Sequence, residues 1–158
     1  MGDMGNVEEE VQLTFEAFVE KNLQAAVNYA GGNPDIDRIW LYTILDEGSI
    51  DVGIYYRYRG QFCGFGELPF LDPEGHYDDE QLEDEQDEFD WNSFMSAMRQ
   101  LPEMPERIIV AYDPEQGSVE STWDYEGTKD DPDDPGWRAR DRWIVSLGGK
   151  PDFGPVEN

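Results

Sequence analysis

The sequence predicts an α+β domain whose core is an antiparallel β-sheet of about five strands. Three observations indicate this class. The chain opens with an amphipathic helical pattern, and short runs of β-branched and aromatic residues follow in pairs joined by turn residues. A middle helical pattern separates two groups of these runs, and a short helical pattern follows the last one. A chain of 158 residues corresponds to a single domain, here spanning 1–158.

The N-terminal helix is predicted over residues 7–30. Apolar side chains recur there at spacings of three and four, which places them on one stripe of a helix. These residues are Val11, Phe15, Phe18, Val19, Ala26 and Tyr29. Two glycines at 31–32, followed by Asn33 and Pro34, end the helix. We expect the ends of the chain, 1–6 and 150–158, to be prone to disorder because they are rich in small and polar residues.

Three strands of a β meander are predicted next, over 38–45, 50–59 and 61–68. The second strand alternates between an apolar face with Ile50, Val52, Ile54, Tyr56 and Tyr58 and a face with Asp51, Gly53, Tyr55, Arg57 and Arg59. A period of two with one apolar face is typical of a sheet packed on one side only. We therefore expect helices mainly against one face, with four aromatic residues largely buried: Trp40, Tyr56, Trp123 and Trp143.

The second half of the chain predicts a middle helix over 91–101, a strand pair over 107–112 and 119–125, and a short helix over 137–147. The intervening DPEQG has the Pro and Gly of a hairpin turn. The last helix carries the one basic cluster of the chain. We expect it to pair with two acidic loops, at 72–90 and 126–136. This cluster consists of Arg138, Arg140 and Arg142.

The charge of the chain excludes several classes of function. The sequence has 37 Asp and Glu against 11 Lys and Arg, for a formal net charge of −26. Such a chain does not bind nucleic acid by neutralising phosphates, and anionic lipid does not attract it. No apolar run approaches the ~18 residues of a membrane span, and no basic segment before an apolar one marks a secretion signal. The single cysteine, Cys63, excludes an internal disulfide, so we expect a cytoplasmic protein.

Residues 72–90 form the main candidate site. Eleven of these nineteen residues are acidic, and self-repulsion predicts an exposed loop or a frayed helix. Clustered carboxylates can cover a basic cleft in place of phosphates, and aromatic side chains beside them can anchor the contact. The predicted partner-binding residues are Tyr77, Asp78, Asp79, Glu80, Glu83, Asp84, Glu85, Asp87, Glu88, Phe89, Asp90 and Trp91. The alternative is a solvated loop for solubility, although a net charge of about 2–8 suffices for that.

A series of apolar and aromatic landmarks runs through about 40–148. They are WLYTILDEG, VGIYYRYRG, an LP after the third strand, STWDYEG and RDRWIVSLG. In this order they resemble the YezG-type immunity family, whose members neutralise toxins that bacteria use against neighbouring cells. The resemblance implies an α+β fold, no catalysis and the binding of a toxin domain, and it carries over no site residue. The acidic stretch is longer and denser than expected of the family, so either the partner differs or this stretch is the variable recognition element.

No catalytic, metal or cofactor site is predicted. A second acidic loop offers oxygen ligands to a hard cation from Asp130, Asp131, Asp133 and Asp134. The spacing of a calcium-binding EF-hand is absent, and prolines interrupt the loop. His76, the only histidine, and Cys63 have no adjacent nucleophile–base motif, and the glycine fingerprints of phosphate loops are missing. We therefore expect no enzymatic activity.

The favoured function is an immunity protein that binds and occludes a basic, nuclease-like toxin domain. The alternative is an acidic nucleic-acid mimic that inhibits a DNA- or RNA-binding protein, and a small hydrolase is a third reading that lacks any motif. The clustering of acids in 72–90 and 113–134 favours a docking patch over a replica of a duplex. Tyr55, Arg57 and Arg59 are candidates for a secondary interface. The toxin's chemistry, the toxin surface that is covered and the oligomeric state stay open.

Overall fold

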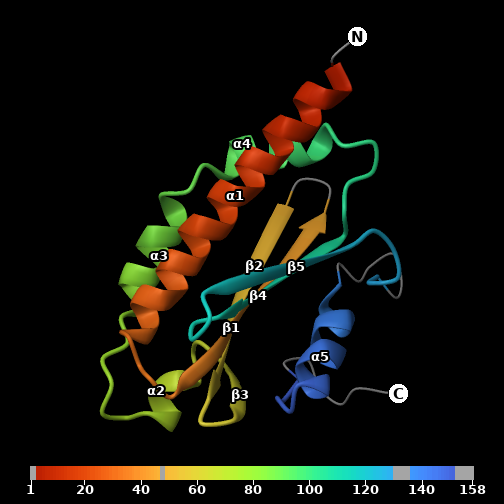
Figure 1. The fold of residues 1–158 in the computed structure, drawn as a ribbon. Coiled ribbons are helices and arrows are strands. Elements are labelled where there is room, and N and C mark those ends of the chain that lie inside the picture. The colour runs from red at the N-terminus through yellow and green to blue at the C-terminus, as the bar shows by residue number, and fades with distance from the viewer. Residues whose placement is uncertain (1–2, 47–48, 130–135, 152–158) are drawn as a thin grey trace.

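The computed structural model describes residues 3–46, 49–129 and 136–151, and it confirms the predicted α+β class. An antiparallel five-stranded sheet has the order β3-β2-β1-β4-β5 (Figure 1). The strands are β1 (Ile36–Asp46), β2 (Ser49–Tyr58), β3 (Gln61–Gly64), β4 (Arg107–Asp113) and β5 (Ser118–Asp124). The helices are α1 (Asp3–Ala30), α2 (Leu68–Leu71), α3 (Asp79–Asp87), α4 (Trp91–Arg99) and α5 (Trp137–Ser146). None of the helices in these three stretches combines the length and the apolar character that a membrane span requires.

A tight turn sets the pairing of β2 with β3. Arg59 and Gly60 connect the two strands with φ angles of 50° and 78°, which lie in the left-handed region. Two such residues in succession form a type I′ turn, whose twist matches that of the flanking strands. Arg59 adopts this conformation while its backbone N–H and its Nε each donate to Asp35 at 3.0 Å. The turn therefore fixes the register of the short strand β3 at one edge of the sheet.

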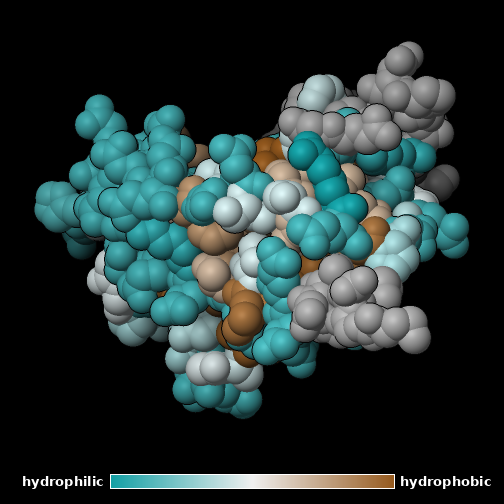
Figure 2. All heavy atoms as spheres, turned by 90° about the horizontal axis from the view of Figure 1, so that it is seen from above, coloured by the Kyte–Doolittle hydropathy of each residue, from teal (hydrophilic) through white to brown (hydrophobic). Residues whose placement is uncertain are grey.

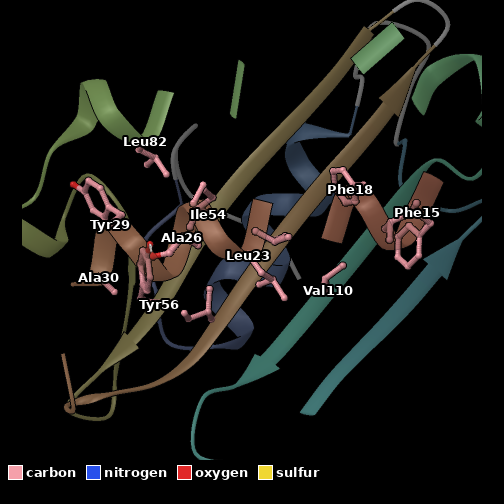
Figure 3. Packing of buried hydrophobic residues seen from close by; sticks show 14 of the residues in the cluster. Phe15, Phe18, Leu23, Ala26, Tyr29, Ala30, Ile54, Tyr56, Leu82 and Val110 are labelled. Carbon is pink, nitrogen blue, oxygen red and sulfur yellow. Dashed lines mark hydrogen bonds between the residues drawn. The ribbon is translucent and has the colours of Figure 1, made fainter. Parts of the chain in front are cut away.

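Helices α1, α3 and α4 cover one face of the sheet (Figure 1). Most of the predicted apolar stripe of α1 is buried here, and Phe18 and Ala26 are fully enclosed. The rings of Phe18 and Phe94 lie 4.6 Å apart, and the Tyr56 hydroxyl of β2 donates to the Ala26 carbonyl at 2.7 Å. Figure 3 shows the buried side chains of α1 together with those of the strands they pack on. This face holds the main core of the protein.

The opposite face of the sheet is also covered, which corrects the prediction of a sheet packed on one side only. Helix α5 lies across it (Figure 1). The ring of Trp143 is centred 4.9 Å from Tyr42, 5.3 Å from Tyr55 and 5.5 Å from Phe62. Tyr55 lies on the face of β2 that reads as polar in isolation. Because β1 and β3 add aromatic side chains to the same face, its centre is apolar and needs cover.

Several element boundaries differ from the predicted ones. Helix α1 already begins at Asp3, and β3 ends at Gly64 because the chain turns there toward α2. The stretch 72–90 contains the regular helix α3. Four aromatic residues were expected to be largely buried. Trp40 and Tyr56 are buried, whereas Trp123 and Trp143 are only half-buried. Residues 1–2 and 152–158 of the predicted disordered ends lie outside the described residues.

The cover on both faces predicts a large difference between two Phe→Ala variants. Phe62 is 5% exposed in the cluster beneath α5, whereas Phe70 of α2 is 85% exposed. We expect Phe62→Ala to lower the free energy of unfolding by about 3 kcal/mol and Phe70→Ala to change it by less than about 0.5 kcal/mol. Urea titration followed by circular dichroism measures both values. Equal stabilities of the two variants would contradict a core on the α5 face.

Candidate functional site

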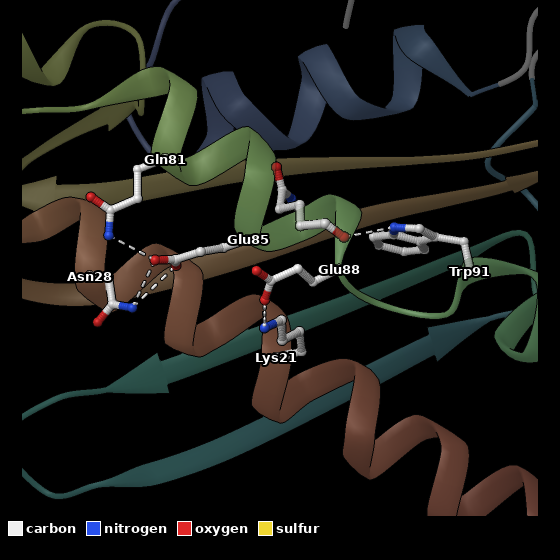
Figure 4. Close-up of polar contacts among 7 residues, drawn as sticks. Lys21, Asn28, Gln81, Glu85, Glu88 and Trp91 are labelled. Atoms are coloured by element: carbon white, nitrogen blue, oxygen red, sulfur yellow. Dashed lines mark hydrogen bonds and ion pairs between the residues drawn. The ribbon is translucent and has the colours of Figure 1, made fainter.

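The acidic stretch 72–90 folds back along α1, and α3 runs antiparallel to that helix (Figure 4). Asn28 of α1 donates to Glu85 at 3.2 Å, and Lys21, two turns earlier in α1, donates to Glu88 at 2.6 Å. On the inner side of α3, Leu82 is 4% exposed within the main core. Helix α3 is therefore docked by an apolar side chain and by polar contacts with α1, rather than frayed.

Local contacts explain why so acidic a segment is helical. The Asp78 carboxylate accepts a hydrogen bond from the backbone N–H of Gln81 at 3.0 Å and so caps the N-terminus of α3. Asp79 and Glu80 lie in the first turn, where the helix dipole favours negative charge. Farther along, the Gln81 side chain donates to Glu85 at 2.9 Å (Figure 4). These contacts offset part of the repulsion among the carboxylates.

Further carboxylates of the predicted site have partners inside the fold. Asp79 accepts from the Tyr29 hydroxyl at 2.7 Å, and burial together with this hydrogen bond raises the pKa of Tyr29. Asp90 caps α4 by accepting from the hydroxyl of Ser93 at 2.7 Å and from its N–H at 3.0 Å. These hydrogen bonds lower the pKa of Asp90. Asp78, Asp79 and Asp90 thus support the local structure.

The outer side of α3 carries four carboxylates of a different kind. Glu80, Glu83, Asp84 and Asp87 are exposed, and their i, i+3, i+4, i+7 spacing places them on one helix face, opposite Leu82. In the described part of the chain, none of the four side chains has a hydrogen-bond or ion-pair partner. We call these four residues the outer acidic face. They are the members of the predicted set that remain available to another molecule.

The three aromatic residues predicted as partner anchors are half-buried against the core of the protein itself. Phe89 and Trp91 meet edge to face at 4.8 Å, and the indole Nε1 of Trp91 donates to the Gln86 carbonyl at 2.9 Å (Figure 4). The Tyr77 hydroxyl donates to Asp72 at 2.6 Å, and burial together with this bond raises the pKa of Tyr77 to about 12. The structure uses all three to close the core beneath the acidic stretch.

Two exposed aromatic residues just before the acidic stretch are ones that the sequence analysis did not single out. Phe70 is 85% exposed and Phe65 is 37% exposed. The LPFL segment carries a signal for the first of them. Pro69 suits the first turn of a helix, and in such a turn Leu68 and Leu71 share the inward side while Phe70 points away.

The secondary interface candidates are also engaged within the fold. Tyr55 is buried, with its ring stacked 5.4 Å from that of Phe62, so it does not line an exposed face. Arg57 donates to Asp37 at 2.7 Å, and this contact lowers the pKa of the Asp37 carboxyl. Arg59 pairs with Asp35 at 3.0 Å. In the basic cluster of α5, Arg140 pairs with Asp51 of β2. Most of the second acidic loop, with which this cluster was expected to pair, lies outside the described residues.

His76, Cys63 and the second acidic loop are the features that the sequence analysis considered for catalysis or metal binding. His76 is exposed and lines an open hollow at the start of α3, among acidic side chains. Cys63 is fully buried, and burial raises its pKa to about 12. Within 3–46, 49–129 and 136–151, no group of three or more His, Cys, Asp or Glu side chains is arranged to hold a metal ion. The four aspartates of the second acidic loop lie outside the described residues.

Hydrophilic residues cover much of the side of the molecule seen in Figure 2, and apolar residues reach the surface in a smaller area near the middle.

No protein-family model matches the chain, and no curated protein matches it. The resemblance to the YezG-type immunity family therefore stays a prediction. Charge and geometry are the main support for any function of this protein.

The division of the carboxylates predicts opposite outcomes for two Asp→Ala variants at α3. Asp78→Ala removes a helix cap and should lower the free energy of unfolding by about 1 kcal/mol. Asp84→Ala removes an unpartnered charge of the outer acidic face and should change it by less than about 0.5 kcal/mol. Thermal unfolding followed by circular dichroism compares the two. A loss at Asp84 as large as that at Asp78 would mean that the outer acidic face is part of the structural network.

The burial of Cys63 predicts a masked thiol. Its pKa of about 12 in the folded protein lies above the value of about 8.5 for an unfolded thiol. A thiol-specific disulfide reagent at mildly alkaline pH should therefore react in concentrated guanidinium chloride and not in native buffer. By linkage, the stability that depends on the protonated thiol is complete below about pH 8.5 and is lost as the pH rises toward the folded-state pKa. Rapid labelling of the native protein would contradict this.

Proposed function

We propose that the protein is an immunity protein of the bacterial cytoplasm that binds a basic, nuclease-like toxin domain and blocks it by occlusion. The outer acidic face of α3 carries this proposal, because it presents exposed carboxylates without partners in the described structure. The resemblance of WLYTILDEG and the other landmarks to YezG-type immunity proteins supports the same function. No catalysis is part of it.

The electrostatics of the chain support a partner with a basic surface. A toxin that acts on nucleic acid binds phosphates through a positively charged cleft, and carboxylates on a rigid helix can occupy the same positions. The net charge of −26 attracts such a surface before contact is made. Helix α3 is held against α1 through Lys21 and Asn28, so the outer acidic face approaches the partner without first having to order itself.

A nucleic-acid mimic is the second candidate, and the length of the outer acidic face argues against it. From Glu80 to Asp87 the helix rises by about 10 Å, which equals the rise of about three base pairs. A duplex replica needs carboxylates spaced like phosphates over a longer surface. The compact face favours a local docking contact with one protein domain.

Binding kinetics test the proposal, with the toxin domain captured from the native organism as the partner. The test variant combines Glu80→Gln, Glu83→Gln, Asp84→Asn and Asp87→Asn. A control variant with the same change in net charge combines Glu8→Gln, Glu9→Gln, Glu10→Gln and Glu20→Gln in α1. In stopped-flow measurements at low salt, the test variant should associate about tenfold more slowly than the wild type. The control should associate at nearly the wild-type rate, and the difference between the variants should shrink at high salt.

Two outcomes would overturn the proposal. If both variants slow association equally, the overall charge matters and the outer acidic face is not the docking surface. If neither changes the rate at either salt concentration, the acidic stretch serves solubility alone. Inhibition of the captured toxin's activity by the wild-type protein is the accompanying functional readout.

A further inference from the structure

The outer edge of β2 is only half used by the sheet. Strand β3 pairs with β2 over Tyr55–Tyr58 alone. The chain then leaves the edge with one last hydrogen bond, from the Phe65 N–H to the Ile54 carbonyl at 3.1 Å. Among the described residues, no strand pairs with this edge of β2 from Ser49 to Gly53. A sheet edge of this kind is a template for a further strand.

The register identifies which backbone groups face outward. In an antiparallel ladder, the N–H and C=O groups of successive residues point alternately to the two neighbouring strands. Ile54 bonds outward to Phe65, so Val52 and Ile50 share its direction, while the intervening Asp51 and Gly53 bond to β1. The amide and carbonyl groups of Ile50 and Val52 are therefore directed at the open edge.

The two edges of the sheet differ in their protection. Edge strands commonly avoid unwanted pairing through charged side chains, bulges or proline. The other edge strand, β5, presents the exposed carboxylate of Glu120, while its Asp124 is engaged by Arg107 at 2.8 Å. The free part of β2 has the sequence SIDVG, and its single charge, Asp51, is engaged by Arg140 at 3.0 Å. The β2 edge therefore lacks the local charges that would turn a strand away.

A hollow of about 230 Å³ adjoins the free edge where β3 ends. It is lined on the α5 side of the sheet by Tyr55, Phe62 and Ile144, and by Gly53 and Gly64, which contribute no side chain. One exposed carboxylate and one exposed ammonium group, those of Glu67 and Lys150, also line it. In a strand added to β2, every second side chain would point to this side of the sheet. Next to Gly53, the hollow offers such a side chain the aromatic rings of Tyr55 and Phe62.

We propose that the edge of β2 from Ser49 to Gly53 binds an extended segment of a cationic protein as an additional strand, with one of its side chains in the hollow. A second copy of this chain is disfavoured as the occupant, because two molecules of net charge −26 repel each other. A cationic segment is attracted by the same net charge, whereas the local charges of Glu67 and Lys150 at the hollow offset each other. The charge of the partner rests on the proposed function, whereas the binding mode does not.

A peptide experiment tests the edge without any toxin. The probe is a fluorescein-labelled Lys-Val-Lys-Val-Lys-Val-Lys peptide, and Lys-Pro-Lys-Pro-Lys-Pro-Lys has the same charge but cannot pair as a strand. Fluorescence anisotropy measures binding to the full-length protein. Amide hydrogen exchange locates it, and we expect slower exchange at Ile50 and Val52 with the Lys-Val peptide alone. Equal binding of both peptides, or protection only at β5, would overturn the proposal.

Three variants separate backbone pairing from side-chain contacts. Val52→Pro removes an N–H that faces outward, and Val52→Ala keeps it, so we expect about tenfold weaker binding only for the proline variant. Gly64→Val should also weaken binding by filling the hollow. A Cβ at position 64 lies 3.6 Å from the Glu67 carboxylate and 3.9 Å from the Tyr55 ring, so this variant should fold even if Val52→Pro does not. Unchanged affinity in Gly64→Val would overturn the role of the hollow.

Sedimentation and toxin inhibition distinguish the remaining outcomes. A wild-type dimer that dissociates in Val52→Pro would show that a second copy occupies the edge, which would overturn the cationic partner. Strand pairing by the Lys-Val peptide together with no inhibition of any captured toxin would leave the edge site intact and reject the immunity function. Toxin inhibition without edge protection would do the reverse.

Discussion

The packing of α1 against the sheet is the interaction on which the rest of the structure depends. Its inner stripe, centred on Phe18 and Ala26, meets both the strands and α4. Its flank holds the acidic helix through Lys21 and Asn28. No Lys or Arg occurs between Arg59 and Arg99, so the acidic stretch has no cation of its own. The order of α3 therefore depends on its packing against α1 as well as on its own N-terminal cap.

The charge of −26 is compatible with this fold because the carboxylates of the acidic stretch differ in their partners. Some cap a helix or accept from a buried hydroxyl, as Asp78 and Asp79 do. Those of the outer acidic face lie on the far side of α3, where water and salt screen their mutual repulsion over about 8 Å at physiological ionic strength. The repulsion that remains is opposed by apolar burial on both faces of the sheet, where aromatic rings predominate.

The elements that carry strong local patterns could be predicted from the sequence. The stripe of α1, the alternation in β2 and the DPEQG turn each predicted an element that the structure confirms. The cover on the second face could not be predicted from β2 alone, because Tyr55 becomes apolar surface only when Tyr42 and Phe62 lie beside it. For the same reason the burial of Trp143 was expected, but its place in an aromatic cluster on the second face of the sheet was not.

At the candidate site, too, tertiary neighbours decide the direction of side chains that the sequence pattern leaves open. Once α3 is taken as a helix with Leu82 as its inward residue, the spacing of Glu80, Glu83, Asp84 and Asp87 defines the outer acidic face from the sequence. The direction of the neighbouring aromatics was not predictable in that way. Phe89 lies in the connection between α3 and α4, which has no period, so only the tertiary contact with Phe18 decides that it faces inward. Trp91 is the first residue of α4, and its ring contacts Phe18 as well.

Charge and exposed backbone act together at the surface of this protein. An unpaired strand edge is a hazard mainly because copies of the same chain share it and meet at high concentration. A net charge of −26 opposes that encounter at long range, so the edge of β2 can stay free of local protecting charges without inviting self-pairing. The same field favours a partner of opposite sign at both the outer acidic face and the β2 edge. Selection among partners then depends on the short-range fit of backbone and side chains, which the field cannot supply.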